Sequence, residues 1–338
     1  MFTVVIPLFE KGPYVWRALE SVCGQTCSVA EIIVVNDGST DGGEEFARAF
    51  VPPAGGPALR VIDQPNRGVS AARNAGIAAA TQPFVAFLDA DDRWRPGFLA
   101  AMQVLIDRHP EAVLYGSGFV TVAGDREVHR YGVRPAENSG GTTDLFRALA
   151  RDHVVHPSSM VVPRAAALAV GGFPEGVSHC EDMWFWTKLA LAGSVVLTPE
   201  PLALYDVGVP GQAVEYWQGA YRERFDVLEY HRFLAEELRR LAPAAGPAQG
   251  ARASFATYAR QQLRTAALQR LYWGNFAALD RLWRELRLGD LALGWPVPAC
   301  GWIARHPAVQ PAVGAVLAVA RSIRESLKPC RPRGAAAA

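Results

Sequence analysis

Alternating strand and helix signals in the first ninety residues constrain the fold of this chain more than any other feature. Short apolar runs rich in β-branched residues predict strands at 2–9, 31–37, 58–64 and 83–90. Segments with helical periodicity lie between them and predict helices at 12–25, 39–50 and 68–81. A β-α-β-α-β-α-β order predicts an α/β domain with a mostly parallel sheet, covered by helices on both faces.

Beyond residue 95 the alternation loosens. The pattern there predicts a helix at 96–108, strands near 112–123 and 127–133, a helix at 142–151, a strand and short helix in 158–173, a helix at 180–193, and a strand and turn in 194–207. From about residue 211 the sequence is helical, with helices predicted near 212–240, 252–272, 275–288 and 308–328. We therefore expect an α/β domain over 1–208 and a helical C-terminal region over 209–338.

The two predicted regions differ in charge. Residues 1–208 contain 16 Lys and Arg against 23 Asp and Glu, whereas residues 209–338 contain 18 against 10. This difference favours an anionic surface as a partner of the basic region. Two globular pieces with differently charged exteriors explain the same numbers, so both interpretations stay open here.

The sequence also bounds the cellular location. Five cysteines at irregular spacing favour a reducing compartment over a disulfide framework. No apolar stretch reaches the roughly 18–20 residues of a membrane span; the nearest, 312–320, lies between Pro311 and Arg321. The N-terminal apolar run has no basic region before it and is interpreted as a first strand. We expect a cytoplasmic protein, with peripheral contact at the inner face of the cell membrane as a further hypothesis.

A cluster of acids follows one of the predicted strands. In VAFLDADDRW (85–94), four apolar residues lead directly into Asp89, Asp91 and Asp92. Ligands of parallel sheets bind at the carboxyl ends of strands, and Asp37 stands at a second such end. Because neighbouring carboxylates repel each other, the cluster predicts a nearby cation, and the acid cluster alone leaves open which ligand brings it.

Several segments in fixed order resemble family-2 glycosyltransferases of the GT-A fold, over residues 1–205. They are VVIPLFEKGPYVWRALESVCGQT, EIIVVNDGSTDGG, QPNRGVSAARNAGIAAATQPFVAFLDADD, GGFPE and CEDMWFWTKLALAG. The resemblance implies a Rossmann-like, nucleotide-binding sheet. It also implies transfer of a sugar from a nucleotide-sugar donor to an acceptor hydroxyl with inversion, using Mn²⁺ or Mg²⁺.

The resemblance assigns the acid cluster to the donor. Asp89-Ala90-Asp91 is similar to the family's DxD motif, which implies that Asp91 contacts the metal, while Asp89 contacts the ribose or helps indirectly. The metal would neutralise the charge that develops on the departing diphosphate. Asp92 is interpreted as a helix cap.

Further donor contacts are implied by the same resemblance. Asp37 stands where the family reads the base, and a carboxylate that accepts an imide N–H favours uracil. Pro7 and Phe9 match the entry motif P-x-[YF]-N, with Phe9 placed to stack on the base and Glu10 where Asn is commoner. Two further residues, Arg67 and Gly68, resemble the loop beside the diphosphate. For Arg73 and Asn74, inside the next helix, a structural role is predicted.

Glu181-Asp182 resembles the family's ED motif. An inverting transfer needs one base to take the proton of the attacking hydroxyl. The resemblance assigns this role to Asp182 and acceptor positioning to Glu181. His156 and His179 are interpreted as polar wall residues.

Two other functions remain as alternatives. A nucleotidyltransferase also uses a parallel sheet and a metal-binding Asp, but it usually opens with a Gly-rich basic loop, which PLFEKG is not. A catalytically silent sugar-nucleotide-binding protein would not need Asp37, Asp91 and Asp182 together.

The expected partners are a nucleotide-sugar donor, with UDP-sugars favoured, and a glycan or lipid-linked acceptor of cell-surface polysaccharide or glycolipid biosynthesis. Nucleic acid is not expected. Peripheral membrane contact is predicted through Arg239, Arg240, Arg321, Arg324 and Arg331.

Overall fold

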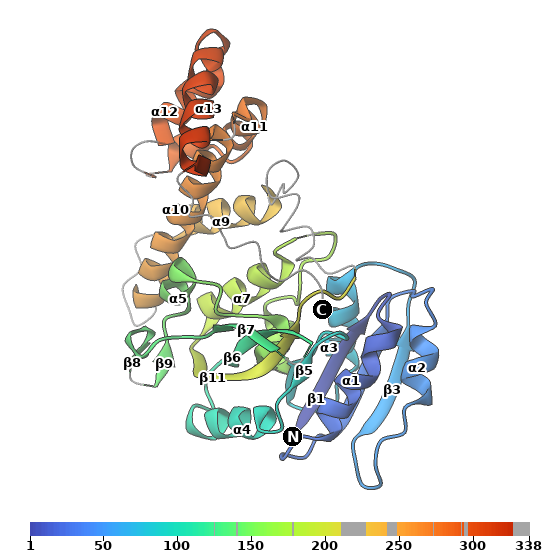
Figure 1. Cartoon of the computed structure of the whole chain (residues 1–338). Helices are drawn as coiled ribbons and strands as arrows, with labels where there is room; N and C mark the ends of the chain where they lie inside the picture. The colour runs from blue at the N-terminus through green and yellow to red at the C-terminus, as the bar shows by residue number, and fades with distance from the viewer. Residues whose placement is uncertain are drawn as a thin grey trace. The chain divides into compact units, whose positions relative to one another are not determined.

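The computed structural model describes residues 1–338 except 125, 140, 178, 211–227, 242–248, 273, 292, 294–296 and 327–338. The chain divides into two compact units. Unit 1 comprises Met1–Tyr230 and Leu241–Tyr258, and unit 2 comprises His231–Arg240 and Ala259–Ala338. Figure 1 shows the sheet of unit 1 and the helices of unit 2. The boundary expected at residue 208 stays a prediction.

A single large sheet organises unit 1 and has the mostly parallel character that the sequence predicts. The strand order is β3-β2-β1-β4-β10-β6-β11-β5, and β7 pairs with β6. The strands are β1 (Phe2–Leu8), β2 (Glu31–Asn36), β3 (Ala58–Asp63), β4 (Phe84–Phe87), β5 (Arg93–Trp94), β6 (Leu114–Ala123), β7 (Arg126–Tyr131), β10 (Met160–Pro163) and β11 (Val195–Asp206). Among neighbours, β3, β2, β1 and β4 pair in parallel, whereas β10 runs antiparallel to both β4 and β6.

Helices of unit 1 connect these strands. They are α1 (Gly12–Cys23), α2 (Gly43–Ala49), α3 (Val69–Ala79), α4 (Phe98–Arg108), α5 (Leu145–Arg151), α6 (Arg164–Ala169) and α7 (Glu181–Ala192), together with the short 3₁₀ helix η2 (Pro157–Ser159). A small hairpin, β8 (Asn138–Ser139) with β9 (Thr142–Thr143), was not predicted from the sequence.

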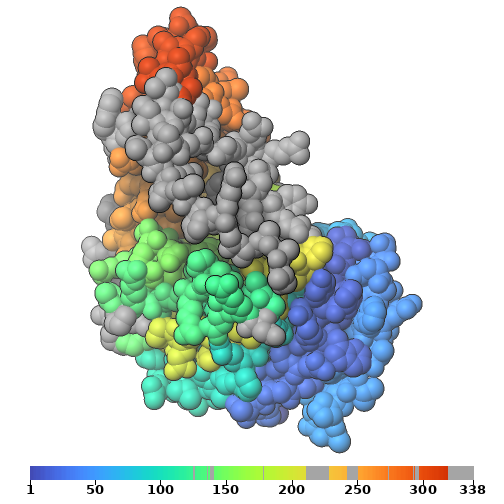
Figure 2. Space-filling model, viewed as in Figure 1, coloured from blue at the N-terminus to red at the C-terminus, as the bar shows by residue number. Residues whose placement is uncertain are grey.

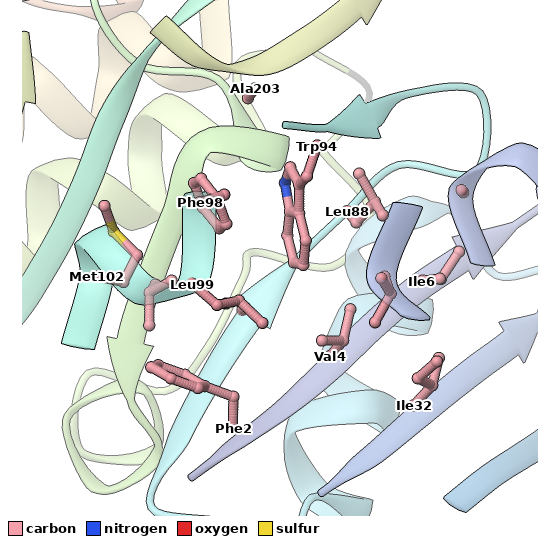
Figure 3. Packing of buried hydrophobic residues seen from close by; sticks show 14 of the residues in the cluster. Phe2, Val4, Ile6, Ile32, Leu88, Trp94, Phe98, Leu99, Met102 and Ala203 are labelled. Carbon is pink, nitrogen blue, oxygen red and sulfur yellow. The ribbon is translucent and has the colours of Figure 1, made fainter. Parts of the chain in front are cut away.

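Both faces of the sheet are buried, which explains why its strands are continuous apolar runs. Along β2, Ile32 and Val34 belong to the core that includes α1, whereas Ile33 and Val35 pack on the opposite side with Ala72 of α3. Figure 3 shows the first of these cores, where side chains of β1 lie between Ile32 of β2 and the aromatic and aliphatic residues of the segment 94–102. This packing fixes the strand ends from which the polar loops emerge.

Two expectations for unit 1 were wrong in detail. The predicted helix at 39–50 begins only at Gly43, because the side chain of Asp41 accepts hydrogen bonds from the N–H groups of Gly12 (2.7 Å) and Gly43 (3.0 Å) and holds a loop there. The strand and turn predicted for 194–207 form one strand, β11, whose register against β6 shifts near Pro201 instead of turning.

Helices account for the described C-terminal elements. They are α9 (Leu228–Arg240), α10 (Gln249–Tyr272), α11 (Phe276–Glu285), α12 (Val297–Arg305) and α13 (Gln310–Ser326), with the 3₁₀ segments η3 (Leu288–Asp290) and η4 (Pro307–Val309). The expected helical character is confirmed, although α12 was not predicted and residues 211–227 of the first predicted helix lie outside the described residues. Within the described part, no helix combines the length and apolarity needed to cross a membrane.

Candidate active site

The acid loop after β4 is held by residues that come from a distant part of the chain. The hydroxyl of Ser158 donates to Asp92 Oδ2 and accepts from the N–H of Asp89 (3.0 Å). The N–H of Asp206 donates to Asp92 Oδ1 (3.3 Å). Asp92 is fully buried, and burial together with the nearby charges of Asp91 and Asp89 raises its pKa well above the usual range. Asp92 therefore lies in the interior of this loop, where we had expected only a helix cap.

Arg73 connects the acid loop with the start of α7. Its side chain is only 3% exposed and donates to Asp89 Oδ1 (2.8 Å) and to Glu181 Oε1 (3.1 Å). Burial alone would lower the pKa of Arg73, but the Asp89 and Glu181 carboxylates raise it. The same pairing outweighs the burial of Asp89 and lowers its pKa. Arg73 therefore has an electrostatic role at the centre of the site, beyond the structural one predicted from its helical position.

Glu181 and Asp182 occupy the first turn of α7. The preceding Cys180 has a left-handed backbone (φ 60°), which ends the incoming loop abruptly. Burial and the adjacent Asp182 raise the pKa of Glu181 to about 7, and burial raises the pKa of Asp182. Carboxylates with raised pKa values in a buried site are suited to accept protons near neutral pH.

Asp91, the predicted metal ligand, is paired with a lysine. Lys11 Nζ lies 3.5 Å from Asp91 Oδ2 and also donates to the carbonyl of Pro210. Lys11 follows the entry motif at the end of β1, so this pair joins the entry segment to the acid loop. The neighbouring Ala90 is buried and contributes only backbone.

A second group of possible metal ligands includes His156, which the sequence analysis interpreted only as a polar wall residue. Ligand atoms of Asp89, Asp92 and His156 all lie within 4.8 Å of one another in the described chain. His156 Nδ1 is 3.5 Å from Asp92 Oδ2, and burial lowers the pKa of His156 to about 4, so the imidazole is neutral. Carboxylate oxygens around one point fit a hard divalent cation such as Mg²⁺ or Mn²⁺. The role of Asp91 at the metal stays a prediction.

Asp37 organises the loop before α3. One carboxylate oxygen accepts from Gln64 Nε2 (2.7 Å) and the Arg67 N–H (2.9 Å), and the other from the Gly68 N–H (2.8 Å). Gly68 has a positive φ of 88° at the start of α3, which suits glycine. The side chain of Arg67 pairs with Glu175 (2.8 Å). Base recognition by Asp37 stays a prediction, and its remaining lone pairs are what such a contact would use.

The entry motif is placed at the end of β1, beside the loop after β2. Pro7 pairs with Val35 in the sheet, and Phe9 follows the strand with 45% of its side chain exposed, as a stacking residue requires. Glu10 Oε1 accepts from the N–H (2.7 Å) and hydroxyl (3.0 Å) of Thr40. Glu10 thus joins the two loops, which is a structural explanation for a carboxylate where the family more often has Asn.

Three groups of side chains therefore meet at the carboxyl ends of β1, β2 and β4. A parallel sheet with an antiparallel β10, an acid loop after β4 and an acidic first turn of α7 define the GT-A fold. Solved structures of this fold agree. The chain is similar to residues 1–349 of Staphylococcus aureus TarS in complex with UDP-GlcNAc, with a TM-score of 0.67, 20% identity, and coverage of 96% of this chain and 92% of that one. It is also similar to the mannosyltransferase PcManGT from Pyrobaculum calidifontis in complex with GDP-Man and Mn²⁺, with a TM-score of 0.52, 20% identity, and coverage of 96% and 87%.

The sequence comparison gives the family. Residues 3–169 match the family model described as Glycosyl transferase family 2, and this part of the chain belongs to that family. Its relatives include the uncharacterized glycosyltransferase YibD of Escherichia coli K12, 44% identical over 94 residues that cover 28% of this chain and 27% of that protein. Another is the uncharacterized glycosyltransferase EpsJ of Bacillus subtilis 168, 30% identical over 129 residues that cover 38% and 37%. These alignments thus span only about a quarter to two fifths of each relative.

Proposed function

We propose that this protein is an inverting glycosyltransferase that moves a sugar from a nucleoside-diphosphate-sugar to an acceptor hydroxyl. The observation that carries the proposal is the buried guanidinium of Arg73. It forms ion pairs with both Asp89, on the proposed donor side, and Glu181, on the proposed acceptor side. A direct displacement needs its leaving group and its base on opposite sides of one carbon. The two acidic motifs joined through Arg73 match this requirement.

On the donor side, the proposal uses the loops at the ends of β1, β2 and β4. Phe9 stacks on the base, Asp37 accepts its imide N–H, and Arg67 with Gly68 borders the diphosphate. Uracil is favoured by the imide argument, and the similarity to TarS, solved with UDP-GlcNAc, is consistent with it. A fold neighbour solved with GDP-Man shows that the fold alone does not select the base.

Asp91 and the neighbouring acids would hold a divalent cation, Mn²⁺ or Mg²⁺, together with the donor. A fold neighbour solved with Mn²⁺ and GDP-Man is consistent with this assignment. When bound, such a cation supplies Lewis acidity at the leaving diphosphate. Lys11 lies 3.5 Å from Asp91, so its ammonium group partly offsets the charge of the acids when no cation is bound.

On the acceptor side, Asp182 takes the hydroxyl proton. The bond from the acceptor oxygen to the anomeric carbon forms while the bond to the diphosphate oxygen breaks, and the proton passes to the carboxylate of Asp182. Glu181, fixed by Arg73, positions the acceptor. A glycan or a lipid-linked sugar of cell-surface polysaccharide or glycolipid assembly is the acceptor class that we propose. Membership of family 2 favours this reaction over nucleotidyl transfer.

A thermal-shift screen of nucleotide-sugars, with Mn²⁺ or with EDTA, tests donor class and metal coupling together. Saturation to 100 times the dissociation constant stabilises a protein by about 2.7 kcal/mol, so UDP-sugars with Mn²⁺ should raise the Tm by several degrees. Asp91→Asn should lose the metal-dependent part of the shift. Equal Tm shifts with EDTA and with Mn²⁺ would contradict metal-coupled donor binding. The absence of a Tm shift with every diphosphate-sugar would contradict the donor assignment.

A further inference from the structure

Over its described residues 310–318, helix α13 of unit 2 has an exposed face made only of apolar residues. In Figure 2 the described residues of the C-terminal helices run from orange to red. The exposed residues of α13 among 310–318 are Pro311, Ala312, Ala315, Val316 and Ala318. They recur at helical spacing, and Val316 is 69% exposed. We call this surface the α13 face. On an ordinary surface helix the outward face carries polar residues, so this pattern is inverted.

The opposite side of α13 is the one that packs. Val313, Gly314 and Leu317 are partly covered, and a Cβ added at Gly314 would lie 3.8 Å from Phe276 of α11. None of the described α13 side chains is fully buried. The helix therefore rests on unit 2 by one edge and leaves its apolar face without a covering element among the described residues.

A large aromatic side chain is exposed on the preceding helix. Trp302 of α12 is 49% exposed and stacks on His306, with ring centroids 4.4 Å apart. A tryptophan that is partly solvent-exposed is typical of the boundary between water and lipid. Exposed Trp302 and the α13 face thus occur within seventeen residues of the same unit.

The part of the sequence that contains this surface is strongly basic. Residues 291–338 contain six Lys and Arg and a single acid, Glu325. Arg321 and Arg324 are on the last turns of α13, directly after its apolar part. By contrast Arg239 donates to the carbonyls of Leu286 and Arg287, and Arg240 pairs with Glu237. Arg239 and Arg240 thus have partners within unit 2, and the predicted Arg331 lies outside the described residues.

We propose that α13, with Trp302, is an interfacial helix that binds the surface of an anionic lipid bilayer. Apolar side chains on one face with arginines at the end allow a helix to lie in the headgroup region without crossing it. A second copy of the chain is a poorer occupant, because an isologous contact would bring two patches of the same positive charge together. The proposal does not depend on the donor chemistry proposed above.

Vesicle co-sedimentation of the full chain tests this directly. The probes are vesicles of phosphatidylcholine with phosphatidylglycerol and vesicles of phosphatidylcholine alone, at about 0.05 M and about 0.5 M NaCl. We expect binding to the anionic vesicles that falls at high salt, since each basic residue near such a surface contributes about fivefold. No binding to anionic vesicles at low salt would overturn the proposal.

A matched pair of variants locates the contact. Val316→Glu should weaken vesicle binding at least about tenfold, because it places a charge where an apolar side chain enters the headgroups. Val104→Glu, at a 45% exposed valine of α4 in unit 1, should leave binding unchanged. Equal losses in the two variants would overturn the assignment to α13. A wild-type dimer that Val316→Glu converts to a monomer, without vesicle binding, would instead assign the face to self-association. UDP-sugar binding should be measured for both variants as well. If they bind UDP-sugar but not vesicles, the membrane proposal fails while the transferase assignment stands.

Discussion

At the scale of single residues, Arg73 joins the acid loop after β4 to the first turn of α7. Its two ion pairs reach residues 16 and 108 positions away in sequence, and Phe173 lies against the guanidinium at 5.2 Å. Any change in this charge alters the carboxylates on both sides. The consequence should therefore appear in proton affinities as well as in stability.

Replacing Arg73 should shift the pH dependence of catalysis. In Arg73→Gln the neutral amide no longer stabilises the ionised acids, so the acid limb of kcat/KM should move upward by about one pH unit. Arg73→Lys keeps the charge and should restore most of that limb, with a lower kcat because the forked geometry is lost. If the acid limbs of the kcat/KM profiles were identical in wild type and Arg73→Gln while the Tm of the variant was lower, Arg73 would have only a structural role.

Removing the proposed base should affect turnover and spare donor binding. Asp182→Asn keeps the shape of the side chain but cannot accept the hydroxyl proton, so kcat should fall by about 10²–10⁴. Calorimetry with UDP and Mn²⁺ should give nearly unchanged affinity. Turnover within a few-fold of wild type would exclude Asp182 from this role and make Glu181 the next residue to test.

At the scale of elements, the contact between α3 and β1 sets the position of Arg73. Gly76 of α3 has no room for a side chain, since a Cβ there would lie 2.3 Å from Val5 Cγ1. Gly76→Ala should therefore push the helix away from the sheet and destabilise the protein by about 1–3 kcal/mol. Gly250 of α10 is the matched control, because nothing lies within 4 Å of an added Cβ and alanine is the better helix former. A Tm for Gly76→Ala equal to that for Gly250→Ala would contradict this packing argument.

The elements also show what sequence could predict. Strands β1 to β4 and the helices between them were predicted because buried parallel strands are long apolar runs, and the acids at their ends followed from the polarity of the sheet. The pairing of Arg73 with Glu181 was not predictable, because it depends on how α7 packs. Ser158 was missed, and the position of His156 beside Asp92 was not predicted, for a similar reason: only the insertion of β10 beside β4 brings them to the acids.

At the scale of the whole molecule, the buried acids make stability depend on pH. Glu181 has a pKa of about 7 in the folded protein, above its unfolded value near 4.3. Between these values the folded state binds more protons, so this group's contribution to the free energy of unfolding falls as the pH rises. Neutral His156 acts in the opposite direction below about 6.5, because there the unfolded chain takes up the proton.

A comparison with Glu181→Gln isolates the first of these contributions. The difference in unfolding free energy, variant minus wild type, should increase between pH 5 and 8 by about 1–3 kcal/mol. Urea unfolding at both pH values measures it, and constant m values show that the denatured states are comparable. A difference that stays flat with pH would mean that Glu181 remains ionised throughout, held by Arg73.

The antiparallel strand β10 has a consequence for the chain during its synthesis. The acids at 89–92 leave the ribosome well before Ser158, whose hydroxyl joins Asp89 to Asp92 and whose carbonyl accepts from the indole of Trp94. A nascent chain that ends before residue 157 therefore has the acid loop but lacks the serine that orders it. We expect the acid loop to become ordered only after β10 has inserted between β4 and β6, so that the proposed donor binding would be acquired late in translation.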